Sequence, residues 1–152
     1  MNGLTFATWM LIVSSFSMGA VAWVGLYQAL FVFPEYFSAP PGSLRRYQSD
    51  KSWKFWLPLH AVALPAIILS LITNWDNDRF GLVMTATVLY TLSWIATFIF
   101  FIPGVMEFNK VDPDGPPSEE LAAKGRSWLR RSTVRLVLML SAAALLVIAL
   151  GR

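Results

Sequence analysis

The last apolar stretch of the chain, WLRRSTVRLVLMLSAAALLVIAL at residues 128–150, decides the fold. A helix that crosses about 30 Å of hydrocarbon needs roughly 20 apolar residues, and this stretch supplies them after a basic beginning. An extended strand is excluded, because its unpaired backbone groups would be buried in lipid. The stretch therefore predicts a membrane-spanning helix. Arg130 and Arg131 precede its apolar part, and Arg135 lies inside it.

Three further segments have the same length and character. With the last one, the predicted spans cover residues 5–33, 55–73, 80–102 and 132–150. The whole chain is 56% hydrophobic and only 14% charged, which is too apolar for an ordinary soluble domain. The first residues lack the basic segment of a signal peptide, so we expect the first span to be retained. We predict an all-α integral membrane protein, an antiparallel four-helix bundle, with a single domain over residues 1–152.

Two shorter patterns refine this prediction. Ser15 and Gly19 lie four residues apart in a first span rich in small residues, which favours close helix packing. The segment SEELAAKGR at residues 118–126 predicts a separate short amphipathic helix that Ser118 caps.

The positions of the basic residues predict the orientation. Of the twelve Lys and Arg residues, all but Arg79 and Arg152 lie in or beside the two longer loops, between spans one and two and between spans three and four. Cytoplasmic loops carry an excess of Lys and Arg. We therefore expect both longer loops in the cytoplasm and both termini on the non-cytoplasmic side, in a bacterial inner membrane. The basic loops suit anionic membrane lipids, and nothing in the sequence indicates nucleic acid.

Several classes of site are excluded by composition. The chain has no cysteine and one histidine, His60, so it cannot form a disulfide or a thiolate site. The sequence contains no glycine-rich phosphate loop, no zinc-ligand spacing and no nucleophile elbow. We expect neither a metal nor a cofactor.

Polar side chains inside the apolar spans are costly and need a reason. On a common depth scale, five of them converge near the predicted cytoplasmic ends of the spans: Gln28, His60, Glu107, Asn109 and Arg135. Pro103 and Gly104 are expected to bend or end the third span just before two of them. An unpaired cation at this depth costs several kcal/mol, so Glu107 is the expected partner of Arg135.

These residues have two interpretations. As a site, the catalytic candidates are His60, Arg135 and Asn109, and the substrate-binding candidates are Gln28, Tyr90, Trp94, Glu107 and Trp128. From the first loop, Glu35, Tyr36 and Tyr47 would cover them. As structure, His60 and Gln28 form hydrogen bonds between helices, Tyr90 and Trp94 are core aromatics, and Arg135 with Glu107 forms a clamp. The residues alone leave both interpretations open.

The order of elements resembles a family of small four-span membrane proteins that includes the membrane-type anthrone oxygenases. The resemblance rests on PGVMEFN at residues 103–109 and on a Trp followed seven residues later by an Arg, here Trp128 and Arg135. Ser132 stands where that family often has a His. The resemblance implies a cofactor-independent oxidoreductase with an aromatic or quinone-like substrate. His60 would act as base, and Arg135 or Asn109 would stabilise the developing enolate.

A non-catalytic alternative fits the same chain. A small, apolar protein with packing motifs also suits an accessory or scaffold subunit that binds lipid or quinone, as a homo-oligomer or within a larger membrane complex. A multidrug-type transporter fits less well, because its first span would need a carboxylate and this one has none.

Overall fold

The computed structural model describes residues 5–152, apart from the side chain at position 53. Residues 1–4, which the topology prediction assigns to the non-cytoplasmic side, lie outside the described part. The described chain is helical with no strand. Its helices are α1 (Phe6–Tyr27), η1 (Gln28–Val32), α2 (Phe33–Tyr36), α3 (Leu44–Ser49), α4 (Trp53–Thr73), α5 (Phe80–Ala96), η2 (Thr97–Phe101), α6 (Ile102–Phe108) and α7 (Glu119–Leu150).

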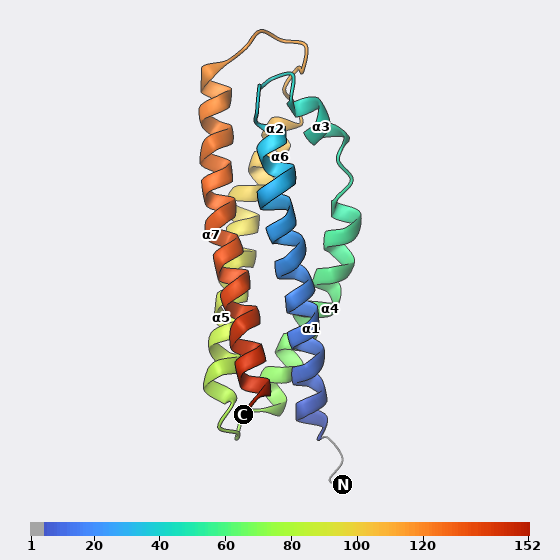
Figure 1. The fold of residues 1–152 in the computed structure, drawn as a ribbon, viewed down its shortest axis with the longest axis vertical. Helices are drawn as coiled ribbons and strands as arrows, with labels where there is room; N and C mark the ends of the chain where they lie inside the picture. Colours follow the sequence, from blue (N-terminus) through green and yellow to red (C-terminus); the bar gives the residue numbers. More distant parts are fainter. Residues whose placement is uncertain (1–4) are drawn as a thin grey trace.

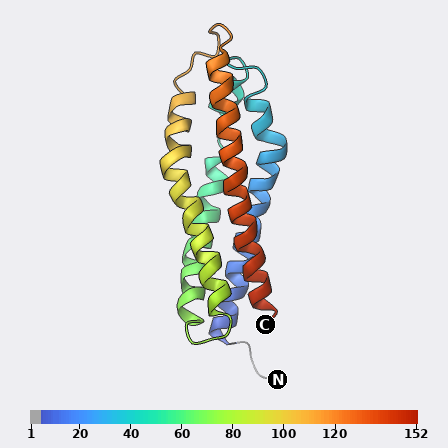
Figure 2. The ribbon, with the colours of Figure 1, turned by 90° about the vertical axis from the view of Figure 1, so that its left-hand side faces the viewer.

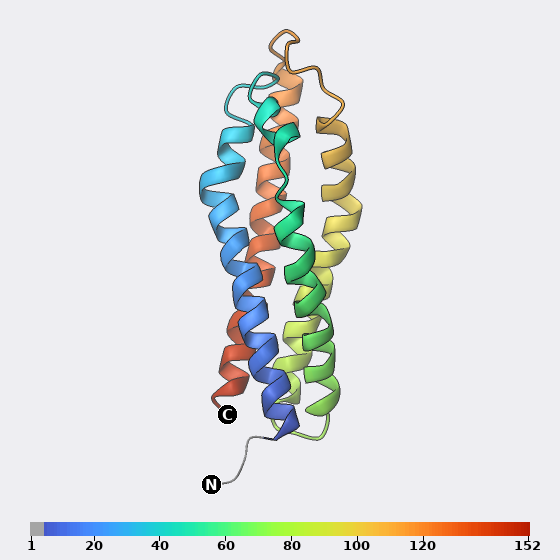
Figure 3. The same cartoon turned by 90° about the vertical axis from the view of Figure 1, so that its right-hand side faces the viewer.

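The helices form an antiparallel four-helix bundle along one long axis (Figure 1). Its four long members are α1–η1–α2, α4, α5–η2–α6 and α7. Both described chain ends and the turn at residues 74–79 lie at one end, which we call the terminal end. The segments 37–52 and 109–118 lie at the other end, which we call the loop end. α7 packs between α1 and α5 (Figure 2), and α4 packs on the other side of α1 (Figure 3).

Four helical stretches of the described chain are long and apolar enough to cross a membrane: 6–36, 54–73, 80–108 and 119–150. The predicted all-α four-helix bundle is confirmed, and the architecture is compatible with an integral membrane protein. All four stretches extend beyond their predicted bounds at the loop end, the second by a single residue. The prediction of a separate helix at 118–126 is wrong, because this segment is the first part of α7. The Ser118 cap is present and accepts a hydrogen bond from the Leu121 amide at 3.2 Å.

The core in the terminal half is built from small and aliphatic side chains of all four long helices. α1 packs tightly against α7 at Gly25, where a Cβ atom would lie 3.2 Å from Met139 Cε and 3.3 Å from Leu136 Cδ1. At Gly19 no atom would lie within 4 Å of such a Cβ. Ser15 turns its hydroxyl back onto the Leu11 carbonyl at 2.7 Å. Close packing is thus found at Gly25 and not at the expected Gly19.

Two π-helical turns, η1 and η2, interrupt the first and third long helices. In each, the residue just before a proline donates its amide to a carbonyl five residues back: Phe33 to Gln28, and Ile102 to Thr97. Pro34 and Pro103 follow, and the ring of a proline clashes with the carbonyl four residues earlier in a regular helix. A π turn widens the helix at that point. The third helix therefore continues through Pro103, which neither ends it nor leaves it regular.

Candidate functional site

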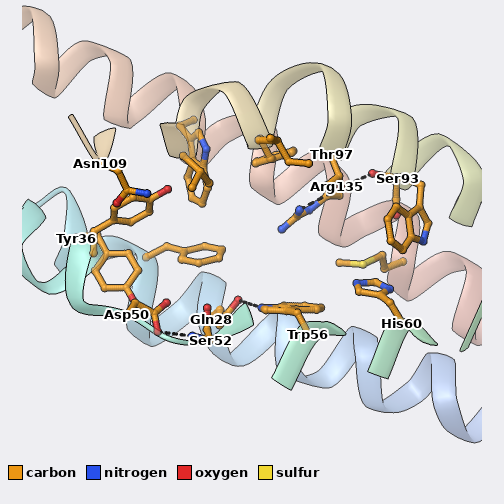
Figure 4. A pocket seen from close by; sticks show the side chains of 18 of the residues that line it. Gln28, Tyr36, Asp50, Ser52, Trp56, His60, Ser93, Thr97, Asn109 and Arg135 are labelled. Atoms are coloured by element: carbon orange, nitrogen blue, oxygen red, sulfur yellow. Dashed lines mark hydrogen bonds between the residues drawn. The ribbon is translucent and has the colours of Figure 1, made fainter. Parts of the chain in front are cut away.

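A pocket of about 470 Å³ lies within the loop-end half of the bundle. All four long helices and the α3 segment contribute to its wall, and Figure 4 shows the polar side chains that point into it. The lining residues are Gln28, Phe33, Tyr36, Tyr47, Gln48, Asp50, Ser52, Trp56, His60, Ser93, Trp94, Thr97, Phe101, Ile102, Val105, Asn109, Trp128, Arg135 and Met139. Both π turns contribute to this wall, through Gln28 and through Thr97 with Phe101.

His60 is held in one orientation at the deep end of the pocket. Its Nδ1 atom lies 2.6 Å from the Tyr90 hydroxyl, which is completely buried behind it. One ring face stacks on Trp56 with 5.3 Å between ring centroids, and Trp94 meets the imidazole edge-on at 5.0 Å. Because Nδ1 is engaged by Tyr90, Nε2 is the nitrogen left for a ligand.

Arg135 reaches into the pocket from α7 without an anionic partner (Figure 4). Its guanidinium lies 4.1 Å from the Phe101 ring centroid, and Nη1 donates to Thr97 Oγ1 at 3.3 Å. Its Nε atom is buried and has no hydrogen-bond partner among the described residues. None of the ion pairs in the described chain involves Arg135. The described residues thus leave the Arg135 cation in the pocket without a counter-ion.

The expected pair between Arg135 and Glu107 is wrong. Glu107 accepts from Lys124 Nζ at 2.6 Å on the bundle surface and does not line the pocket. The π turn η2 explains the difference. It adds a residue to one turn, so the residues after it are rotated by about 100° relative to a regular helix. The prediction rested on depth along the bundle, and depth does not fix the face of the helix on which Glu107 lies.

Gln28 and Trp56 form a second polar pair in the wall. The Trp56 indole donates from Nε1 to Gln28 Oε1 at 2.9 Å, which joins the first long helix to α4. With its oxygen occupied, the Gln28 amide keeps its NH₂ group as a further donor in the pocket wall. Gln28 therefore forms the interhelical hydrogen bond and also lines the cavity, so both interpretations of this residue apply together.

The segment around α3 roofs the pocket at the loop end. Gln48 donates to the carbonyls of Phe108 at 3.1 Å and Val111 at 2.7 Å, which fastens α3 to the end of α6. Burial, and to a lesser degree the nearby Asp50 carboxylate, raises the pKa of the Tyr47 phenol. Tyr47 thus remains a neutral hydrogen-bond donor at physiological pH. Its hydroxyl is buried and has no hydrogen-bond partner within the described part of the chain.

Aromatic rings form part of the pocket wall near α3. Trp128 meets Phe33 and Phe101 edge-on, at 4.9 Å and 5.2 Å between centroids. Gly104 admits the Trp128 ring, since a Cβ atom there would lie 2.9 Å from Trp128 Cδ1. Glycine at position 104 therefore lets the Trp128 ring pack directly against the backbone of α6.

The structure brings most of the predicted site residues together. His60, Arg135, Asn109, Gln28, Trp94 and Trp128 line one pocket, whereas Tyr90 contacts His60 from behind the wall and Glu107 lies outside. Of the three covering residues, Tyr36 and Tyr47 line the pocket, and Glu35 pairs with Arg46 on the surface. Sequence reasoning missed Trp56 and Asp50. The spacing of Trp56 four residues before His60, on one helix face, is the signal that indicates the stack.

Within the described residues, no group of three or more His, Asp or Glu side chains is placed to hold a metal ion. Comparisons with protein-family models, curated proteins and solved structures find no match for this chain.

Proposed function

We propose that this chain is a membrane enzyme that binds a flat, hydrophobic aromatic molecule with carbonyl oxygens and oxidises it without a cofactor. The observation that carries the proposal is the meeting of an unpaired guanidinium, Arg135, with an oriented imidazole, His60, in one aromatic pocket. The resemblance to membrane-type anthrone oxygenases favours the same chemistry.

The reaction begins with proton removal from a ring CH₂ group conjugated to a carbonyl. With its proton on Nδ1, His60 donates to Tyr90 Oη and presents the Nε2 lone pair as a base. When Nε2 takes the substrate proton, Tyr90 continues to accept from Nδ1. The charge that develops on the substrate oxygen is stabilised by Arg135 and by the Gln28 amide, two donors fixed before the reaction starts.

Dioxygen is the oxidant in this scheme. The carbanion forms a C–O bond with O₂, the peroxide takes the proton from the imidazolium, and loss of water leaves a new carbonyl. In balance, one CH₂ group and one O₂ give one C=O group and one H₂O. The protein supplies the base, the oxyanion donors and an apolar cavity, and the substrate supplies the electrons.

The test is oxygen uptake by the purified protein in detergent micelles with anthrone as substrate. We expect one O₂ consumed for each quinone formed. His60→Ala and Arg135→Met should each lower turnover by about a hundredfold or more. Arg131→Met is the matched control. Arg131 lies on the same helix with its guanidinium 4.8 Å from the Phe100 ring centroid, but it is outside the pocket. This control should stay within about twofold of the parent.

Full turnover in both pocket variants would refute the proposed roles. Trp56, Trp94 and Trp128 line the pocket, so a quinone bound there should quench tryptophan fluorescence. Quenching that requires Arg135, without oxygen uptake, would instead assign the chain to the alternative class of non-catalytic, ligand-binding subunits.

We also propose that the loop end faces the cytoplasm of a bacterial inner membrane, as the crowding of Lys and Arg at that end favours. The absence of cysteine allows a direct test. Ser49→Cys lies at the loop end, and Asp76→Cys lies in the turn at the terminal end. In intact spheroplasts a membrane-impermeant maleimide should label the Asp76→Cys variant, and the Ser49→Cys variant only after lysis. The reverse pattern would invert the topology.

A further inference from the structure

Three pocket residues are also exposed on the outside of the bundle. They are Ile102, Val105 and Asn109, and every other lining residue is buried or partly buried. Their spacing of three and then four residues places them on one face of α6 and its C-terminal cap. Together they span about 10 Å along α6, at 1.5 Å per residue.

The route from the loop end is covered. α3 lies over the pocket with Leu44 completely buried, and the two hydrogen bonds of Gln48 fasten it to the end of α6. Tyr47 of α3 packs edge-on against Phe108 of α6, with 5.7 Å between the ring centroids. A molecule entering from the aqueous side would have to displace this roof.

The outer surface of the bundle around Ile102 and Val105 is apolar. The neighbouring exposed side chains of the third long helix are large and apolar: Phe98 and Ile99 of η2 and Met106 of α6 are each more than half exposed. The rim itself changes from Ile102 and Val105 to the amide of Asn109 toward the loop end. Its polarity thus follows the change from acyl chains to headgroups in a bilayer leaflet.

The geometry points to lateral entry. We infer that the pocket opens into the bilayer through a slot rimmed by Ile102, Val105 and Asn109, and that its ligand is a lipid-dissolved amphiphile. The inference rests on the proposed function for the aromatic nature of the ligand. An apolar body would pass Ile102 and Val105, while an oxygen acceptor moves inward to Arg135. The uncompensated guanidinium gives such a group its binding partner.

Cysteine chemistry in proteoliposomes tests the slot without any substrate. Thr97→Cys places a thiol in the pocket wall beside the Arg135 guanidinium, which favours the reactive thiolate. We expect lipid-dissolved N-phenylmaleimide to label it at least tenfold faster than a sulfonated, water-soluble maleimide. Adding Val105→Trp should fill the slot and slow labelling by N-phenylmaleimide at least tenfold.

Two controls fix the interpretation. Val134→Trp carries the same change on an exposed face of α7 away from the slot, and should leave labelling of Thr97→Cys within about twofold. Ser132→Cys is buried but outside the pocket, and gives the background rate.

Equal labelling by both reagents, unaffected by Val105→Trp, would show entry from water and overturn the inference. Labelling of Thr97→Cys by neither reagent above the Ser132→Cys background would show a closed pocket and also overturn it. Failure of the oxygen-uptake assay would reject the proposed chemistry but leave the labelling pattern unchanged. The two failures are therefore distinguishable.

Discussion

Replacement of Arg135 by methionine should make the protein more stable while it abolishes ligand binding. An ion moved out of water costs several kcal/mol even after relaxation. The contact of the Arg135 guanidinium with the Phe101 ring stabilises the folded protein by about 0.5–2 kcal/mol. The 3.3 Å hydrogen bond to Thr97 contributes about 1 kcal/mol more. The unpartnered Nε adds a further cost of about 1–3 kcal/mol. We therefore expect Arg135→Met to raise the free energy of unfolding by about 1–3 kcal/mol.

The assay is equilibrium unfolding in detergent micelles, followed by far-UV circular dichroism. Arg131→Met is the control, since Arg131 also lies over a phenylalanine ring but is exposed. It should change the unfolding free energy by no more than about 0.5 kcal/mol. A ligand at a hundred times its Kd should stabilise the parent by about 2.7 kcal/mol and the Arg135→Met variant not at all. A loss of stability in Arg135→Met alone would show that the guanidinium is a structural clamp and would refute the reasoning.

Two further predictions concern glycine packing in α1 and α7 and the buried phenol of Tyr47. A Cβ atom at Gly125 would lie 2.5 Å from Phe37 Cδ1, so Gly125→Ala should destabilise the protein by about 1–3 kcal/mol in the same unfolding assay. Gly19→Ala, where a Cβ atom meets nothing within 4 Å, should be neutral or stabilising, and equal behaviour of the two variants would contradict this packing. Because burial raises the pKa of Tyr47 above its ordinary value near 10, its stabilising contribution is complete below that pH and is lost as pH rises further. Tyr47→Phe should therefore flatten the decline of unfolding free energy above pH 10, and an unchanged slope would rule out a buried phenol.

The bundle was predictable because hydrophobic length and charge placement are properties of short segments. Nothing beyond the apolar run at 128–150 and its three counterparts is needed to count the spans. The convergence of Gln28, His60 and Arg135 was predictable for a similar reason. Helix rise converts sequence position into depth, and residues at one depth in a small bundle lie near one another.

The pairing of these residues was not predictable, because it depends on rotation about the helix axis. One additional residue in a π turn rotates everything after it, which carried Glu107 to the surface and left Arg135 without it. The proline after each π turn is a local signal of this change. A proline by itself, however, is equally compatible with a kink or with the end of a helix. The depth of each polar residue in the bundle could therefore be predicted from the sequence. The helix face on which its side chain lies could be known only from the structure.

The two π turns occur at the part of the bundle that holds a cavity instead of a packed core. They lie in the first and third long helices at the level of the pocket, with Gln28 beginning one turn and Phe101 ending the other. Each π turn departs from regular helix geometry. The Arg135 side chain lies in the pocket between them, without a counter-ion among the described residues. A protein selected only for packing would close this space with aliphatic side chains, as the terminal half of the same bundle does. Irregular backbone and a charge without a counter-ion among the described residues therefore occur together at one pocket, and the proposed ligand with oxygen acceptors would supply the missing partner of Arg135.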